Sequence, residues 1–531
     1  MPTVSSILRI LLSAYLAALF FFGQPAPLGA KQPKARPATT TSKKTKARAS
    51  SGSASRSLPT KQKSSSVQKK PSGQHARHPQ KSTTRHPSEA PSKAFVSKKK
   101  AGHSATKRTV VVRNTGFQEI FTDTLYSAGL RYRHFIYGKQ RHSVHVAEIS
   151  TTEPSLKVGL IKGLERIDGL ERLGDMSIRH DSTSRDTLYA GINANFWRAY
   201  RNTPIGPMVS GGEVVHLHSY RQWSSAFFDA KNRMTIDQFI LTGKVRMKNR
   251  TLVIDNVNER VDSNGLVVYN TYGGSSIPFV SPIDLEKAAQ EFLQNHSMTT
   301  EDSTESGLNM QTLRDELANA KREASIEFPM KKVVLRYLRT PVINREIPCL
   351  VRAIDSGEVQ MPIRGCIVSF GAMTPLEQLP RRGDTVFIKF STNVADTVQF
   401  LTAVSGTPRL VRQGVAKHEA MIEGSHAKRF LNQNLARTAI GTDRTRTKNY
   451  FVMIEANNEK GKGATLAQTA AIMKAVGAWN AMNLDGGGSA MMIVCGANAC
   501  TNSTVPSGRK ISAALGVFKR QRIPKSSEKD R

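Results

Sequence analysis

Long apolar runs are almost missing from this sequence of 531 residues. The one clear run, Ile10–Phe22, has about 13 residues, fewer than the roughly 20 that a membrane-spanning helix needs. It follows Arg9 and leads into small residues and prolines up to Ala30, which is the pattern of a secretory signal peptide over residues 1–30. An uncleaved N-terminal anchor is the alternative. We therefore expect an exported protein of the periplasm or cell envelope, soluble or surface-associated once mature.

Acidic residues are scarce, above all between Lys31 and Arg108. The whole chain has 41 Asp and Glu against 77 Lys and Arg, a formal net charge of +36. This segment alone contains about 21 of the basic residues and a single acidic residue, Glu89. Large apolar residues are nearly absent from it, so burial cannot offset the entropy cost of ordering. Residues 31–108 are predicted to be a disordered basic linker that contacts an anionic polymer or lipid surface, with a purely solvated spacer as the alternative.

Aromatic residues are also missing from this linker, where Phe95 stands alone. Proteins that bind single-stranded nucleic acid combine positive charge with aromatic platforms for the bases. The absence of those platforms argues against a nucleic-acid partner. The sequence leaves the oligomeric state open.

Cysteine is rare. An even number of cysteines in an exported chain favours disulfides, and a turn between the last two makes that pair plausible. A zinc site is disfavoured because no second closely spaced Cys or His pair completes four ligands. His216 and His218 are two apart and would share one face of a strand, yet such a pair is more often simply exposed. We expect no metal and no cofactor. The four cysteines are Cys349, Cys366, Cys495 and Cys500.

The rest of the chain, residues 109–531, is predicted to be one α+β domain with a β-rich mixed-sheet core, peripheral helices and a helical insertion at about 284–328. Gln118–Leu130 is interpreted as irregular or a short helix, and Gln238–Leu241 as a strand. A helix is predicted to start after Thr465, where Gln468 completes a capping box, and to end at Gly477. Residues 189–197 are interpreted as the end of an apolar strand that runs into two asparagines and two aromatics, and 208–215 as a strand, a glycine turn and a second strand. Further strands are predicted at 109–113, 143–149, 156–161, 226–229, 252–256, 333–338, 349–354, 366–370, 385–390, 450–455, 478–484, 490–494 and 511–518.

The segment Asn483–Ser489 is the strongest candidate for a site. It places Asp485 at the end of an apolar strand, followed by Gly486, Gly487 and Gly488 and then by the hydroxyl of Ser489. Three consecutive glycines are entropically costly and are used where the backbone turns sharply or lets a ligand approach. A tight hairpin in which Asp485 bonds its own backbone is the alternative. The segment is not a Walker loop, because a Lys and a following helix are absent.

Arg437 begins a second candidate segment, Arg437–Gly441, just before a strand-like run. The guanidinium group is a planar fork of donors suited to phosphate or carboxylate. An ordinary surface arginine is the alternative.

Taken together, several blocks resemble the phosphodiester glycosidase family. They occur in family order over about residues 143–518, interrupted by the helical insertion, and the last block together with the Arg437 block is the specific signal. The blocks are 191–197 (GINANFW), 203–206 (TPIG), 211–215 (GGEVV), 405–411 (SGTPRLV), 437–441 (RTAIG), 465–466 (TL) and 483–489 (NLDGGGS).

The resemblance implies a hydrolase that releases a sugar from a phosphate monoester by cleaving a sugar–phosphodiester linkage, and it implies a role for each matched residue. Asp485 would be the carboxylate near the anomeric carbon, Arg437 the phosphate-binding cation and Glu455 a second carboxylate, these three being the catalytic candidates. Where relatives often carry Asp-Gly and a helical Glu, this chain has Glu455-Ala456 and Gln468. The substrate-binding candidates are Asn193, Asn195, Phe196, Thr203, Gly206, Gly486, Gly487, Gly488 and Ser489.

The substrate is expected to be a glycosyl phosphodiester, for example in an envelope polymer or exopolysaccharide. The alternative function is a non-catalytic module that binds an anionic envelope glycopolymer and is tethered by its basic tail.

Overall fold

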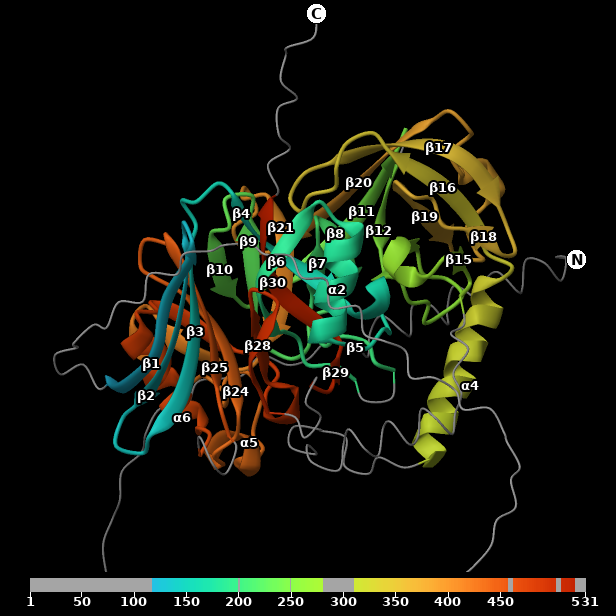
Figure 1. Ribbon diagram of the computed structural model, residues 1–531. Helices are drawn as coiled ribbons and strands as arrows, with labels where there is room; N and C mark the ends of the chain where they lie inside the picture. Colours follow the sequence, from blue (N-terminus) through green and yellow to red (C-terminus); the bar gives the residue numbers. More distant parts are fainter. Residues whose placement is uncertain are drawn as a thin grey trace, which may run out of the picture. The chain divides into compact units, whose positions relative to one another are not determined.

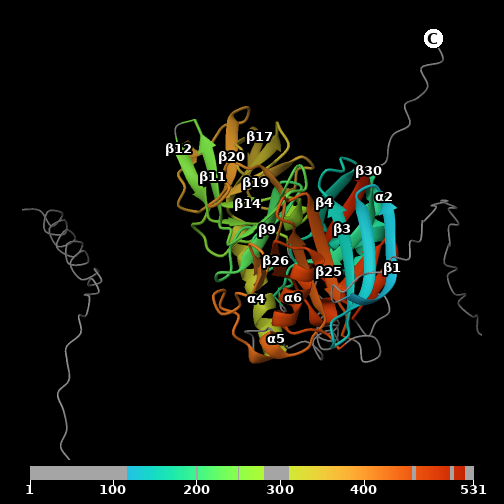
Figure 2. The ribbon, with the colours of Figure 1, turned by 90° about the vertical axis from the view of Figure 1, so that its left-hand side faces the viewer.

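The computed structural model describes residues 117–198, 201–248, 250–279, 310–456, 462–502 and 508–520. The expected signal peptide (1–30), basic linker (31–108) and first strand (109–113) lie outside these residues. Within them the chain is rich in β-strands with few helices, as Figures 1 and 2 show. No helix in these ranges combines the length and apolarity needed to cross a membrane.

An eight-stranded sheet, here called sheet I, carries the candidate site. Its strands come from both ends of the described chain, because β3 pairs with β25 along seven residues. β3 is buried at nearly every position, as expected for a central strand. In spatial order sheet I consists of β1 (Phe117–Ser127), β2 (Leu130–Tyr137), β3 (His142–Ser150), β25 (Lys448–Ile454), β24 (Arg437–Thr442), β26 (Asn480–Asn483), β22 (Arg409–Arg412) and β23 (Val415–Ala416).

A five-stranded sheet, here called sheet II, adjoins sheet I through the segment after β26, and again interleaves early and late strands. β6 lies between β27 and β30, and all of these pairs are antiparallel. In spatial order sheet II consists of β28 (Ala497–Thr501), β27 (Met491–Val494), β6 (Asp186–Asn193), β30 (Ala513–Arg520) and β4 (Leu156–Lys162).

Two further sheets are built from the middle of the chain. Sheet III contains β10 (Met234–Asp237), β9 (Ser224–Asp229), β21 (Phe400–Gly406), β7 (Met208–Ser210) and β8 (Glu213–His216). Sheet IV contains β12 (Arg250–Ile254), β11 (Leu241–Met247), β20 (Thr385–Thr392), β17 (Ile347–Asp355), β16 (Lys331–Tyr337), β19 (Gly365–Phe370), β14 (Val267–Tyr269) and β13 (Asn256–Val257). The β13–β14 pair is parallel, which makes the architecture mixed. Two-stranded pairs join β15 (Ser276–Ile277) to β18 (Val359–Gln360) and β5 (Glu171–Arg172) to β29 (Lys510–Ile511).

The helices lie at the margins of these sheets. α6 (Leu466–Val476) packs against β22 and β24, while α2 (Leu173–Thr183) packs against β6. The capping prediction for α6 is confirmed, since Thr465 accepts from the Gln468 amide and Gly477 is left-handed at φ 114°. The others are α5 (Lys428–Asn432) and α4 (Met310–Glu327). α4 falls inside the expected insertion, of which residues 284–309 lie outside the described ranges.

Two local predictions are wrong. Gln118–Leu130 is mostly strand, because β1 pairs with β2 around a two-residue turn in which Gly129 has φ 80°. Gln238–Leu241 is mainly the connection between β10 and β11 rather than a strand of its own. In both cases the pairing partner, which sequence does not display, decides the outcome.

The expected disulfides are absent, since all four cysteines are free. Cys349 and Cys366 lie on β17 and β19 with β16 between them. Strands two apart are separated by roughly 9.5 Å, beyond the 7 Å reach of a disulfide. Cys495 is exposed at the β27–β28 turn, whereas Cys500 is buried opposite Met492.

Candidate functional site

Three adjacent strands of sheet I bring the catalytic candidates to one end of the sheet. β24 lies between β25 and β26 and is antiparallel to both, with Arg437 opposite Ile454. The start of β24 therefore lies beside the ends of its two neighbours. Arg437 opens β24, Glu455 follows β25 and Asp485 comes two residues after β26.

The glycine segment connects two sheets and is not a hairpin. β26 belongs to sheet I and β27 to sheet II, so the simple-turn interpretation is wrong. Gly487 has φ 55°, a conformation that favours glycine. A Cβ added at Gly486 would lie 2.8 Å from the Ala436 carbonyl oxygen. The glycines thus let the chain cross closely over the start of β24.

Asn193 fixes this crossing with its side-chain amide. Its Nδ2 donates to the Asp485 carbonyl at 2.6 Å, and its Oδ1 accepts from the Thr438 hydroxyl at 2.7 Å and the Met491 amide at 3.1 Å. The Asp485 amide in turn donates to the Ala194 carbonyl at 3.0 Å. Asn193 is therefore a positioning residue for Asp485, as its amide group is occupied by the protein itself.

Asn195 differs from Asn193 because its side-chain oxygen is available as a hydrogen-bond acceptor. Its Nδ2 donates to the Ile205 carbonyl at 3.3 Å, while its buried Oδ1 has no hydrogen-bond partner among the described residues. A buried, unpaired amide oxygen costs free energy unless something donates to it. Asn195 is thus suited to accept a hydrogen bond from a sugar hydroxyl.

Asp485 lies in an environment that disfavours its charge. Burial raises the pKa of its carboxyl to about 6, although the charge of Arg509 and hydrogen bonds from the Ser489 hydroxyl and the Gly486 amide partly oppose the rise. Arg509 is 8% exposed, and its guanidinium carbon lies 5.5 Å from the centre of the Trp197 ring. A partly buried carboxylate with a raised pKa, acted on by the charge of a buried cation, is an arrangement typical of active sites.

Arg437 is engaged with the main chain. Its side chain is 2% exposed, with Nε donating to the Ala464 carbonyl at 2.9 Å and Nη2 to the Phe430 carbonyl at 2.7 Å. Nη2 also lies 3.2 Å from the Gln433 carbonyl. These bonds connect α5 and the segment before α6 to the start of β24. Arg437 therefore holds these three segments together next to the site.

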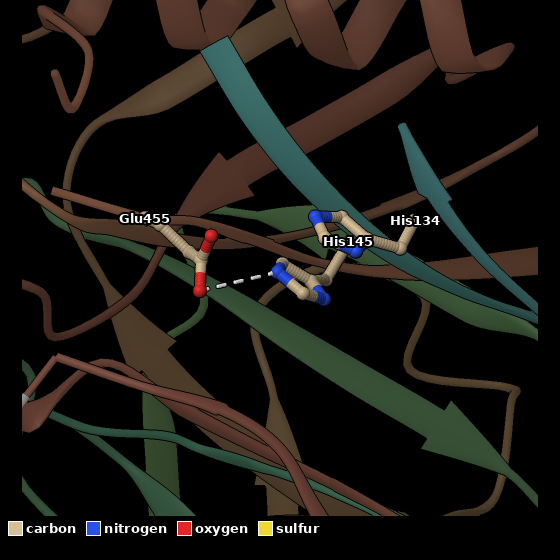
Figure 3. A group of neighbouring side chains, drawn as sticks. All are labelled: His134, His145 and Glu455. Atoms are coloured by element: carbon tan, nitrogen blue, oxygen red, sulfur yellow. Dashed lines mark ion pairs between the residues drawn. The ribbon is translucent and has the colours of Figure 1, made fainter. Parts of the chain in front are cut away.

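Glu455 has its own polar surroundings, drawn in Figure 3 with two histidines. The Ser143 hydroxyl donates to Glu455 Oε2 at 2.5 Å, and His145 Nε2 lies 3.5 Å from Oε1. Burial alone would raise the pKa of Glu455, but His145 and Ser143 outweigh it and lower the pKa to about 2. Glu455 is therefore a carboxylate at neutral pH.

One side chain links the Glu455 segment to the glycine segment. Asn502 accepts from the Ala456 amide through Oδ1 at 3.1 Å, and its Nδ2 lies 3.4 Å from the Gly487 carbonyl. The residue after Glu455 and the middle of the glycine segment therefore share a single bridging amide.

The remaining candidates shape the surroundings. Phe196 is 9% exposed and packs edge-on against Trp223 at 5.4 Å, so it belongs mainly to the core. Thr203 is buried and its carbonyl accepts from the Arg198 amide at 2.8 Å. Gly206 has φ 83°, and a Cβ there would meet the Ser405 side chain at 2.5 Å. Gly488 lies in the short turn Gly487–Ser489.

Sequence reasoning missed Arg509 and His145. Arg509 lies 24 residues beyond Asp485, just before β29 and β30, and the sequence does not show that β30 returns beside β6. His145 is one of two histidines on the largely buried strand β3. His145 pairs with Met453, two residues before Glu455, and this pairing is the signal that would have identified it. Recognising the pairing requires knowledge of the register between β3 and β25.

A separate hollow of about 930 Å³ lies on sheet IV. Its basic lining residues are Arg246, Lys248, Arg250 and Arg381, against the acidic Glu377 and Asp384. Arg246 forms a paired contact with Glu346 at 2.7–2.8 Å, which neutralises part of the positive charge.

Comparison with known proteins gives a family and a fold. Residues 371–518 match the phosphodiester glycosidase family model, which makes this part of the chain a phosphodiester glycosidase domain, a hydrolase class. The match includes the blocks from residue 405 onward, whereas those at 191–215 lie outside it. No curated protein matches the chain.

One solved structure extends the similarity of fold to a larger share of the chain than residues 371–518. A hypothetical protein from Synechocystis has 18% sequence identity and a TM-score of 0.51, with 76% of this chain and 64% of that protein covered. The chain thus spans less than two thirds of that protein and shares its fold. The zebrafish N-acetylglucosamine-1-phosphodiester α-N-acetylglucosaminidase catalytic domain, auto-inhibited by its pro-peptide, has 13% identity, a TM-score of 0.34 and coverage of 77% and 84%.

Proposed function

We propose that this protein, whose residues 371–518 match the phosphodiester glycosidase family, is an enzyme. It would hydrolyse a sugar-1-phosphodiester and release the sugar from a phosphate monoester. The observation that carries this proposal is the partly buried Asp485, set on a glycine crossing between two sheets, with the charge of Arg509 acting on it.

The chemistry requires only modest acid catalysis. Water adds to the anomeric carbon, the bond from that carbon to the bridging oxygen breaks, and the phosphate monoester departs with that oxygen. Phosphate is a good leaving group, so protonation of the bridging oxygen matters less than in an alkyl glycoside. The carboxylate form of Asp485 would stabilise the positive charge on the sugar or accept a proton from the attacking water.

Arg509, rather than Arg437, is our choice for the phosphate-binding cation. Arg509 is the charged partner of Asp485, and guanidinium binds phosphate oxygens well. Arg437 donates to main-chain carbonyls and would act by positioning β24. Asn195 Oδ1 and the amides of the glycine segment would bind sugar hydroxyls or phosphate, and Glu455 would provide a second carboxylate.

The cellular setting belongs to the same proposal. The leader-like residues 1–30 and the basic linker 31–108 support export to the periplasm or cell envelope. A substrate that carries phosphodiester-linked sugars, such as an envelope polymer or exopolysaccharide, would attract the positive chain.

The test is sugar release from N-acetylglucosamine-1-phospho-methyl ester by the purified full chain, with Asp485→Asn and the matched control Asp443→Asn, which changes an aspartate in the turn after β24. Release by the wild type and the control, with loss in Asp485→Asn, would support the reaction and the residue. Equal release by all three would refute the role of Asp485. No release from this substrate or from a panel of other sugar-1-phosphodiesters would count against hydrolysis.

The hollow on sheet IV favours a second candidate, binding of an anionic glycopolymer without cleavage. This function would be favoured if the wild type releases no sugar while the Asp485→Asn variant still binds an anionic glycopolymer. That binding should weaken as salt is added and when Lys248 is replaced by Glu.

A further inference from the structure

His145 offers a buried nitrogen that no hydrogen bond satisfies. The side chain is 2% exposed, and Nε2 has no hydrogen-bond partner in the described structure. It lies 3.5 Å from Glu455 Oε1, within ion-pair distance for a protonated histidine but longer than a normal hydrogen bond. A buried polar atom of this kind usually has a partner, such as an ion or a water molecule.

The surrounding atoms match a small metal site. His134, His145 and Glu455 each offer one ligand atom, and the three atoms lie within 4.8 Å of one another (Figure 3). Ligands of a tetrahedral zinc ion at 2.0–2.2 Å lie roughly 3.3–3.6 Å apart, and the His145–Glu455 separation already has this value. We propose that His134, His145 and Glu455 bind a first-row divalent metal ion of the zinc type, with a fourth position open to water or to a phosphate oxygen.

Tyr132 provides the outer support that such a site needs. Its hydroxyl lies 2.8 Å from His145 Nδ1. A hydroxyl can donate to this nitrogen or accept from it. When Nδ1–H donates to Tyr132, the Nε2 lone pair faces Glu455 and is available to a cation. A metal-bound histidine generally donates its other N–H in this way.

One ligand must move for the ion to bind. The His134 and His145 rings are stacked, with centroids 3.9 Å apart and planes 14° apart, so their in-plane lone pairs run nearly parallel. His134 Nε2 lies 2.9 Å from the Ser143 hydroxyl. Because His134 is only half-buried, its ring can tilt toward the ion while Ser143 keeps its bond to Glu455.

The ligand set selects the class of metal. Two imidazoles and one carboxylate suit zinc and its neighbours, while magnesium and calcium prefer oxygen ligands alone. Three protein ligands also leave a coordination position open, as in catalytic rather than structural zinc sites. The inference does not depend on the proposed hydrolysis, since metal binding is measured without any sugar substrate.

The test is titration of the chelator-treated full chain with Zn²⁺, followed by calorimetry, and with Co²⁺, followed by its visible absorption. We expect one tight equivalent in the wild type. It should be lost in Glu455→Gln and His145→Gln, and Tyr132→Phe should weaken it by about 10–100-fold. Circular dichroism checks that each variant is folded.

A histidine outside the cluster serves as the control, because the chain contains 13 histidines that can bind zinc weakly. His218 is exposed, and its ring centre lies 6.2 Å from that of the buried His216. His218→Gln should leave the tight equivalent unchanged. Absence of tight binding in the wild type, or tight binding unchanged by Glu455→Gln and Tyr132→Phe, would overturn the proposal.

Discussion

Replacing Asp485 by Asn is expected to stabilise the protein at neutral pH. The rise of the Asp485 pKa from 3.8 to about 6 corresponds to about 3 kcal/mol against the charged form. Between these two pH values the folded state binds more protons than the unfolded state, so stability falls as pH rises. The full penalty is present above about pH 6. Asn lacks the charge but can still accept from Ser489 and Gly486, so it avoids the penalty.

The assay compares unfolding of wild type and Asp485→Asn at pH 4 and pH 7.5, by urea or thermal denaturation. The variant should be more stable by up to about 3 kcal/mol at pH 7.5 and nearly equal at pH 4. Asp443→Asn is the matched control, for which the expected change in stability at neutral pH has the opposite sign. Burial would raise the pKa of Asp443, but hydrogen bonds from Thr445 and Lys448 outweigh it and hold the pKa below its usual value. A stability difference for Asp485→Asn that does not change with pH would refute the reasoning.

The other predictions concern the same end of sheet I. Sugar release should decline as pH falls below about 6, because Asp485 becomes protonated; a pH–rate profile flat from 5 to 8 would contradict this. Arg509→Lys should keep the fold, as judged by circular dichroism, yet lower kcat/KM at least tenfold, because the planar fork is lost; unchanged kinetics would exclude Arg509 as the phosphate-binding cation. Arg437→Met should destabilise the protein by about 2–5 kcal/mol in urea unfolding, since three carbonyls each lose a donor; a higher KM at normal stability would instead favour phosphate binding. Gly486→Ala should lower activity and stability through its contact with the Ala436 carbonyl; wild-type kinetics and melting would show that the crossing tolerates a Cβ.

The sequence predicted local features well where the physical cause is local. The capping box at Thr465, the left-handed Gly477 and most strand positions follow from a few neighbouring residues. It failed where the cause is a distant partner. β1 became a strand because β2 pairs with it, and the cysteines stay free because a strand separates one pair. Sequence also does not separate an arginine that donates to carbonyls, Arg437, from one whose charge acts on a carboxylate, Arg509.

The residues matched by the family model do not form the site alone. β25, which precedes Glu455, is held in register by β3, and β27, which follows the glycine segment, by β6, and both partners lie far upstream of residue 371. Asn193 from β6 orients the Asp485 carbonyl, and Ser143 from β3 donates to Glu455. The site is therefore assembled from both halves of the described chain, and loss of the early strands would remove the groups that hold both carboxylates in place. The late blocks match the family model, whereas the geometry of the site also depends on early residues that the match does not reach.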